Sequence, residues 1–330
     1  MTAVALLPER GSCRRLAAPP PTVGPLFVTG AGSSLGFLDV ERATTELSKL
    51  ADPDLFEESA AGIGHVLESV DELDAAARRL LQTGNPHRPS MYGSFPAEVL
   101  GNLAEEEAAK ALILLDAVRC PRARQQEMAR TLGYFYDHIA KGLYVEACRW
   151  RFVELNDVAQ RIEVERVQHY LDGPNGVDFI VPNDVIWRRE SALYVDYVRD
   201  DSEGSGPGAC FWTTPPKEPL VSRFTPAVIE VARALHRAGV TSAPSLAVVA
   251  EIWRPVELRP EMSVRELMRL NQQTLETLHG KGLLAAAPDD VYEVVAGKWL
   301  FPLWPLDLRV RKVKKQDLRE VRRSTWPECW

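Results

Sequence analysis

The sequence lacks any apolar run long enough to cross a bilayer. About 18 consecutive apolar residues are needed, and the densest run here, Ala111 to Leu115, is bounded by Lys110 and Asp116. The N-terminal segment also lacks the apolar core of a signal peptide, since prolines and arginines interrupt it early. We therefore expect a cytoplasmic protein with no membrane partner.

Cysteine is scarce, and none of the 5 cysteines forms a C-x-x-C pair. This argues against a zinc knuckle and against a disulfide framework. The segment Thr29 to Gly36 resembles the opening of a short-chain dehydrogenase, but Ser34 stands where that pattern has glycine. The chain also contains no Tyr-x-x-x-Lys. We interpret the segment as a flexible linker and expect neither a cofactor nor a metal site.

The chain has no excess of basic residues: 39 Lys and Arg stand against 46 Asp and Glu, a net charge of −7. A general polyanion partner is therefore not indicated. The run from Arg309 to Arg323 is an exception that can contact RNA or DNA phosphates. Asp317 and Glu320 dilute it, and such runs are more often solvated faces, so both interpretations stay open.

The residues present predict a mainly helical fold. Apolar residues between Leu67 and Leu81 recur mostly at spacings of three and four, which is typical of a helix. Alternating residues from Leu193 to Val198, then Cys210 to Trp212, predict a small β-hairpin. The expected helices span 39–82, 96–119, 122–152, 156–170, 226–238 and 263–282. The expected organisation is a disordered leader (1–38), a helical domain (39–216) with a hairpin near 192–213, and a C-terminal helical region with a basic tail (217–330).

The strongest local feature is a charged cluster inside an apolar helix. Leu103, Glu107 and Lys110 fall on one stripe of that helix, and Lys110 is otherwise surrounded by apolar neighbours. An unpaired buried ammonium costs several kcal/mol, so Glu106 or Glu107 is expected to pair with it. The alternative is an ordinary ion pair on the helix surface.

The next expected helix presents Tyr134, His138 and Lys141 on one face. If the two helices are antiparallel neighbours, His138 reaches the cluster and can act as an acid or a base. The alternative is a packed histidine beside an Asp137–Lys141 pair. The candidate catalytic residues are Glu106, Glu107, Lys110, His138 and Lys141. The candidate binding residues are Arg189, Tyr194 and Asp196, which a plain alternating strand explains equally well.

These motifs resemble the AbiV family of bacterial abortive-infection proteins. The resemblance rests on Leu103-Ala104-x-Glu106-Glu107-x-x-Lys110-Ala111, on His138-x-x-Lys141, and on Arg189-Glu190-Ser191-x-Leu193-Tyr194-Val195-Asp196-Tyr197, followed by Trp212-Thr213-Thr214-Pro215. It covers about half of the chain. It implies a HEPN-like helical bundle and antiphage defence by a toxin-like effector that acts as a homodimer. The implied partners are a phage-encoded or host protein, with RNA as a possible target.

The usual HEPN ribonuclease motif is absent, because no histidine has an arginine at the Arg-x4-6-His spacing. Arg79, Arg130 and Arg161 precede His87, His138 and His169 by eight positions each. Two mechanisms stay open within the defence hypothesis: RNA cleavage through the Glu/Lys/His cluster, and a non-catalytic switch. A helical protein-interaction module without a defence role is the alternative class of function.

Overall fold

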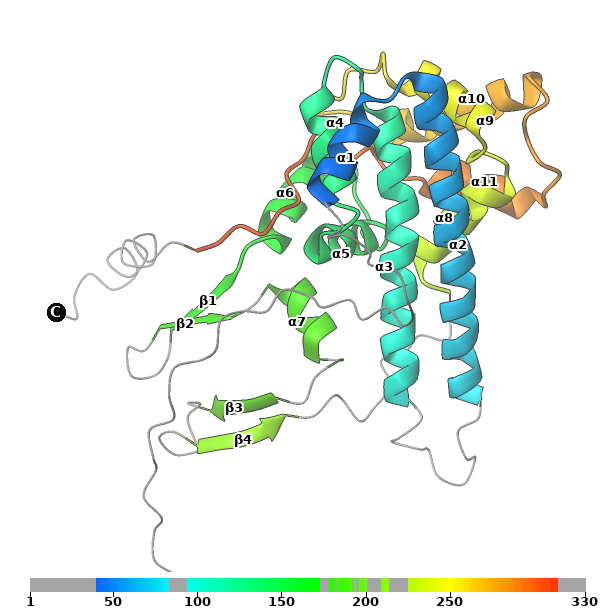
Figure 1. Ribbon diagram of the computed structural model, residues 1–330. Coiled ribbons are helices and arrows are strands. Elements are labelled where there is room, and N and C mark those ends of the chain that lie inside the picture. Colours follow the sequence, from blue (N-terminus) through cyan, green and yellow to red (C-terminus); the bar gives the residue numbers. More distant parts are fainter. Residues whose placement is uncertain are drawn as a thin grey trace, which may run out of the picture. The chain divides into compact units, whose positions relative to one another are not determined.

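The computed structural model describes residues 40–82, 94–172, 178–181, 183–191, 193, 196–200, 209–213 and 225–313. The expected leader and the glycine-rich segment near residue 30 lie outside these ranges. The described part of the chain is mainly helical (Figure 1). None of the helices described is long and apolar enough to span a membrane.

The centre of the fold is α3 (Ser94–Arg119), which lies beside α2 (Asp52–Gln82) (Figure 1). A short helix, α1 (Val40–Lys49), precedes them. The acidic side chains of Asp52 and Asp54 in the first turn of α2 interact favourably with the helix dipole and stabilise this helix. From Ala108 to Val118, α3 is buried at almost every position. Four other helices contact it, so α3 is the core helix of the fold.

Two helices near the sequence centre are shorter than predicted. The single helix expected over 122–152 is wrong: the chain forms α4 (Gln125–Gly133), turns, and begins α5 (His138–Ala147). The Asp137 carboxylate caps α5 by accepting hydrogen bonds from the backbone N–H groups of Ile139 (2.9 Å) and Ala140 (3.3 Å). The helix expected over 156–170 is also too long, because α6 (Leu155–Glu165) ends before strand β1 (His169–Asp172).

Two pairs of short strands flank α7 (Asp184–Ser191) in the sequence. Strand β1 pairs antiparallel with β2 (Asp178–Val181), and β3 (Asp196–Asp200) pairs antiparallel with β4 (Ala209–Thr213). The second pair falls within the 192–213 segment for which the sequence predicts a hairpin. Helix α7 itself packs against α5.

Four further helices follow in the sequence and belong to the same compact unit as the preceding ones. They are α8 (Ala227–Arg237), α9 (Ala243–Trp253), α10 (Val264–Gly280) and α11 (Asp289–Lys298). The sequence did not predict α9, because it is apolar on most sides and buried, which removes the one-sided periodicity of a surface helix.

Ion pairs connect α8 to α2. Arg233 contacts Asp71 and Asp74, each at 2.8 Å.

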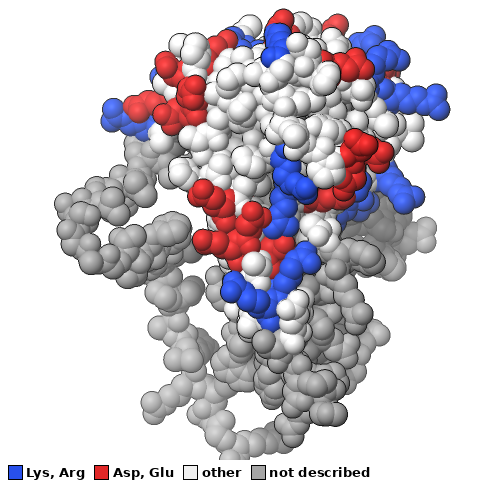
Figure 2. All heavy atoms as spheres, turned by 90° about the vertical axis from the view of Figure 1, so that its right-hand side faces the viewer, with Lys and Arg blue, Asp and Glu red and all other residues white. Residues whose placement is uncertain are grey.

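On the face that Figure 2 shows, acidic and basic side chains lie next to one another rather than forming one large patch of a single sign.

A buried polar network holds the segment after α11 to the core. Asp116 accepts hydrogen bonds from the Tyr144 hydroxyl (2.6 Å) and the Leu303 N–H (2.6 Å), and it pairs with Arg119. The Arg119 guanidinium donates to the Leu300 carbonyl (2.9 Å). Burial, together with the adjacent Asp116 carboxylate, raises the pKa of Tyr144 well above its ordinary value. The network therefore keeps a neutral phenol and a charged pair in the protein interior.

Aromatic rings complete the surroundings of Arg119. Its guanidinium carbon lies 4.8 Å from the ring centroid of Trp253 and 4.7 Å from that of Trp299. These are cation–π distances, and such contacts strengthen when the cation is removed from water.

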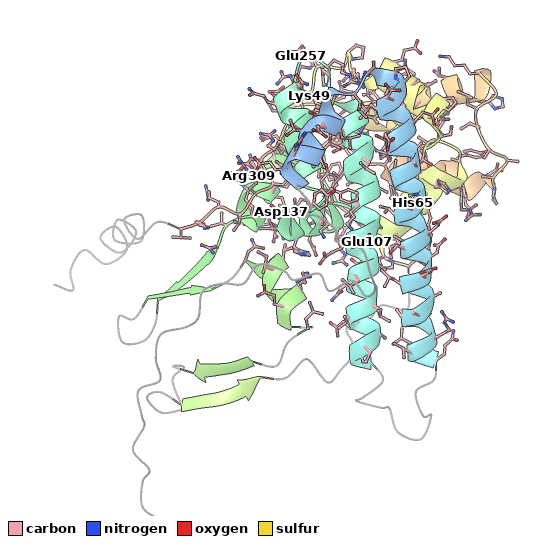
Figure 3. All side chains as sticks on the ribbon, in the orientation of Figure 1. Lys49, His65, Glu107, Asp137, Glu257 and Arg309 are labelled. Atoms are coloured by element: carbon pink, nitrogen blue, oxygen red, sulfur yellow. The ribbon has the colours of Figure 1, made fainter. Side chains whose placement is uncertain are left out.

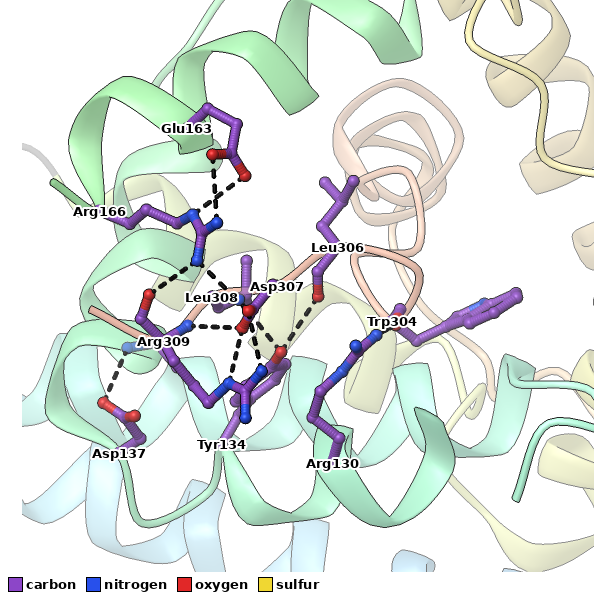
Figure 4. Close-up of polar contacts among 11 residues, drawn as sticks. Arg130, Tyr134, Asp137, Glu163, Arg166, Trp304, Leu306, Asp307, Leu308 and Arg309 are labelled. Atoms are coloured by element: carbon purple, nitrogen blue, oxygen red, sulfur yellow. Dashed lines mark hydrogen bonds and ion pairs between the residues drawn. The ribbon is translucent and has the colours of Figure 1, made fainter. Parts of the chain in front are cut away.

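We call residues 299–311 the C-terminal strap, because backbone groups along this segment are bound by side chains of other helices (Figure 4). The Tyr134 hydroxyl donates to the Leu306 carbonyl (3.0 Å) and accepts from the Leu308 N–H (3.1 Å). Arg130 donates to the Trp304 carbonyl (2.9 Å). The strap thus holds the end of α4 and the turn that leads into α5.

We predict that Asp116→Ala lowers the free energy of unfolding by about 3–5 kcal/mol, because it leaves Arg119 buried without its carboxylate. Urea unfolding followed by circular dichroism measures this. The matched control is Glu251→Ala, which removes an exposed partner of Lys281 and should cost less than about 1 kcal/mol. Equal effects of the two substitutions would show that the network adds nothing beyond a surface pair.

Candidate functional site

The site is built around the buried carboxylate of Glu106 on α3, whose side chain is 11% exposed. His138 Nδ1 lies 2.8 Å from one carboxylate oxygen, and Lys141 Nζ lies 3.0 Å from the same atom. Arg189 Nε donates to the other oxygen at 2.8 Å. Residues from three helices, α3, α5 and α7, therefore meet at one carboxylate.

The charge state of Glu106 follows from these contacts. Burial by itself raises the pKa of this carboxyl, but the hydrogen bond from His138 and the charges of Lys141 and Arg189 outweigh burial and lower the pKa to about 2. Glu106 is therefore ionised at physiological pH. It is a fixed negative charge around which the cationic side chains are held.

His138 is the most exposed member of this group, at 50% against 23% for Arg189. An ionised carboxylate only accepts hydrogen bonds, so the Nδ1–H of His138 must donate to Glu106. In neutral imidazole the other ring nitrogen, Nε2, then carries the lone pair. The His138 side chain is half exposed. A carboxylate that fixes the tautomer of a histidine in this way is typical of acid–base sites.

Lys141 has a different position. Its side chain is only 6% exposed, and it contacts Glu106 rather than Asp137. The alternative prediction of an Asp137–Lys141 pair is therefore wrong, because the Asp137 carboxylate caps α5 instead. Lys141 balances charge within the protein and is poorly placed to contact a large ligand.

A cleft of about 100 Å³ opens beside Glu106. It is lined by polar residues of α3, α5 and α7 and of the turn after α5: Asn102, Glu105, Glu106, His138, Glu146, Arg149 and Arg189. Gly142, Val145 and Val185 complete the lining. A single buried water needs about 10–15 Å³, so the cleft has room for a small polar group.

The structure separates Glu107 and Lys110 from this centre. Lys110 Nζ lies 2.6 Å from Glu107 Oε1 and 4.9 Å from the centroid of the Phe135 ring. Both side chains are about one-fifth exposed, at 18% for Lys110 and 23% for Glu107. The predicted single cluster is therefore two groups, and Glu106 rather than Glu107 is the residue that His138 contacts.

The structure describes the side chain of only one of the three predicted binding residues, Arg189. Arg189 joins the Glu106 centre. Tyr194 lies outside the described residues, and Asp196 is described only as the first residue of β3. Among the residues that the structure describes, no group of three or more His, Cys, Asp and Glu side chains is arranged to hold a metal ion.

Glycine at position 142 allows α7 to approach α5. A Cβ atom added there would lie 2.1 Å from Val185 Cγ1, which is far inside van der Waals contact. Because Arg189 is on the same short helix as Val185, this close approach brings Arg189 to Glu106. Sequence reasoning missed Gly142, although a glycine inside a helical pattern is a known signal of close packing.

We predict that Gly142→Ala destabilises the protein by about 1–3 kcal/mol, because the new methyl group forces α7 away from α5. The matched control is Gly64→Ala in α2, where an added Cβ meets no atom within 4 Å. That substitution should stabilise by about 0.5–1 kcal/mol, the ordinary effect of alanine in a helix. Urea unfolding of both variants gives the comparison.

A double variant identifies the clash itself. Val185→Ala removes Cγ1 and leaves the Cβ at 3.6 Å, an ordinary contact distance. Gly142→Ala should therefore cost much less in the Val185→Ala background than in the native protein. If the cost is the same in both backgrounds, the close approach of α5 and α7 is not what requires glycine.

We predict a pH-dependent contribution of Glu106 to stability. Its folded pKa lies below the ordinary value of 4.5, so its ionised form stabilises the fold above that pH, and this stabilisation is lost as the pH falls towards 2. Glu106→Gln should be destabilised by roughly 3 kcal/mol near neutral pH, and its deficit relative to the native protein should shrink on acidification. Urea unfolding across this pH range measures the deficit.

The neighbouring carboxyl is the control for this experiment. Burial raises the pKa of Glu105. The free energy of unfolding of Glu105→Gln should therefore not fall below that of the native protein near neutral pH and recover on acidification. A Glu106→Gln deficit that stays constant with pH would contradict the assignment of a low pKa to Glu106.

Comparison of this chain with protein-family models, with curated proteins and with solved structures finds no match.

Proposed function

We propose that this protein is an AbiV-like abortive-infection effector with a HEPN-like helical domain, acting in the cytoplasm as a homodimer, and that the Glu106 centre is its working site. One observation carries the proposal. The three motifs of the resemblance each contribute to this centre: Glu106 from the first, His138 and Lys141 from the second, and Arg189 from the third. Arg189 is 83 positions from Glu106 in the sequence, so helical periodicity alone does not bring them together.

The reaction class that fits this centre best is cleavage of an RNA phosphodiester. In this reaction Nε2 of His138 takes the proton of a ribose 2′-hydroxyl while the 2′-oxygen attacks phosphorus and the P–O5′ bond breaks. The leaving 5′-oxygen takes up a proton from solvent water, and cationic side chains stabilise the charge on the phosphorus centre. The two arginines of the cleft, Arg149 and Arg189, supply that cationic character.

A second candidate is a non-catalytic module that binds a phage-encoded or host protein. The observation in its favour is that Glu106 is already paired with Lys141 and Arg189, so the centre can serve as a structural connection between α3, α5 and α7. In that function, His138 is an ordinary hydrogen-bond donor to Glu106.

We predict that His138→Ala abolishes phage protection and lowers RNA breakdown in infected cells by about 10²–10⁴-fold, the usual effect of removing an acid–base group. The fold should persist, because Lys141 and Arg189 still balance Glu106. Plaque counts and total RNA integrity are measured together. The matched control is His65→Ala, which removes an exposed histidine of α2 (Figure 3) and should leave both readouts unchanged.

The outcomes separate the candidates. If folded His138→Ala protects cells but no longer degrades RNA, or if the native protein protects without degrading RNA, the interaction module is favoured. If His138→Ala keeps both activities, the Glu106 centre is not the working site. Lys110→Ala should resemble the His65→Ala control, because Lys110 pairs with Glu107 and not with Glu106.

A further inference from the structure

Arg149 lies at the cleft in a position that two carboxylates share. It pairs with Glu105 of α3 and, at 2.8 Å, with Glu146 of α5. The arginine side chain is 42% exposed, whereas the side chains of Glu105 and Glu146 are 12% and 16% exposed. The cation is therefore the accessible partner of the three, and both carboxylates are largely buried.

The charges that line the cleft explain why an anion can enter it. Besides Glu105, the ionisable side chains that line the cleft are those of Glu106, His138, Glu146, Arg149 and Arg189. Glu106 is neutralised by Lys141 and Arg189, which leaves Glu105 and Glu146 as the competitors for Arg149. Arginine binds phosphate oxygens with paired, planar N–H donors, so a phosphoryl group is a good substitute for a carboxylate partner.

Of the two carboxylates that pair with Arg149, Glu105 is the one whose negative charge is disfavoured by burial. Burial raises the pKa of this carboxyl, and the nearby charge of Arg149 only partly offsets that rise. If Arg149 turned away, the largely buried carboxylate would lose its compensating charge, which would raise the pKa of Glu105 further and favour its protonated form.

We propose that the cleft binds one phosphoryl group between Arg149, Arg189 and His138, and that Arg149 exchanges Glu105 for this anion while Glu105 becomes protonated. The inference rests on the proposed function for its biological meaning, since it names the residues that would hold an RNA phosphate. The binding itself requires no cleavage, so it can be tested separately.

The experiment titrates the full-length protein with inorganic sulfate at constant ionic strength. Sulfate has the shape of phosphate but does not titrate near neutral pH, so any pH dependence belongs to the protein. Arg149→Gln should weaken binding at least tenfold. The matched control is Arg151→Gln, which removes an exposed arginine two positions further along and should change affinity by less than twofold.

Glu105→Gln gives the decisive comparison, because it is expected to increase affinity, which misfolding cannot do. Above neutral pH this variant should bind sulfate at least threefold more tightly than the native protein, and the two affinities should converge as the pH falls. The other ionisable groups of the cleft, His138 included, are the same in both proteins, so their contributions cancel in this comparison. Weaker binding by Glu105→Gln, or equal affinities of Arg149→Gln and Arg151→Gln, would overturn the proposal.

The source of the phosphoryl group is tested with two further ligands, inorganic phosphate and a DNA dinucleotide, which lacks the 2′-hydroxyl needed for cleavage. Competition of both with sulfate assigns the cleft to nucleic-acid phosphates. Competition by phosphate alone keeps the anion site but counts against RNA as the substrate of the proposed function. Competition by neither ligand, with sulfate binding unaffected by Arg149→Gln, contradicts the site. If the native protein binds sulfate as expected but does not cleave RNA, only the proposed function is contradicted.

Discussion

A carboxylate buried in a helical core is stable only if cations and hydrogen-bond donors surround it, and α3 carries two such carboxylates. Glu106 is paired with His138, Lys141 and Arg189, and Asp116 is paired with Arg119 and Tyr144. Most of these partners come from distant parts of the sequence. The requirement to compensate the two charges therefore favours the packing of α5, α7 and the C-terminal strap near these positions of α3.

Helix α5 connects the two buried centres. Its first turn contributes His138 and Lys141 to Glu106, and Tyr144 near its end donates to Asp116. The C-terminal strap secures the other side, since Asp116 binds its backbone and Tyr134 holds it just before the turn into α5. The candidate site at the surface thus depends on a core network that contacts no ligand itself.

The mainly helical fold was predictable from the sequence, because it rests on local patterns. Helical spacing also selected Glu106 and His138 as candidate site residues. Which of two adjacent glutamates faces inward was not predictable. Glu106 and Glu107 lie about 100° apart around the helix, and the inward one is determined by packing with α5 and α7. The expected stripe selected Glu107 and Lys110, which form a separate pair.

Two further features required the three-dimensional structure. The Asp116–Arg119 pair has the spacing of a surface ion pair, so only its complete burial distinguishes it. The role of Gly142 depends on Val185, which is far away in the sequence and meets it only because α7 folds back onto α5. The break within the expected 122–152 helix was also missed, because Asp137 was considered as an alternative partner of Lys141 and not as the cap of a new helix.

Residues of α3, α5 and α7 are physically coupled at Glu106. A double-mutant cycle of Glu106→Gln and Arg189→Gln, with unfolding free energies from urea denaturation, tests this coupling most directly. Direct contact at 2.8 Å predicts a coupling energy of at least about 1 kcal/mol between the two substitutions. Additivity within about 0.5 kcal/mol would contradict the account, because it would mean that α7 does not bring Arg189 to the buried carboxylate.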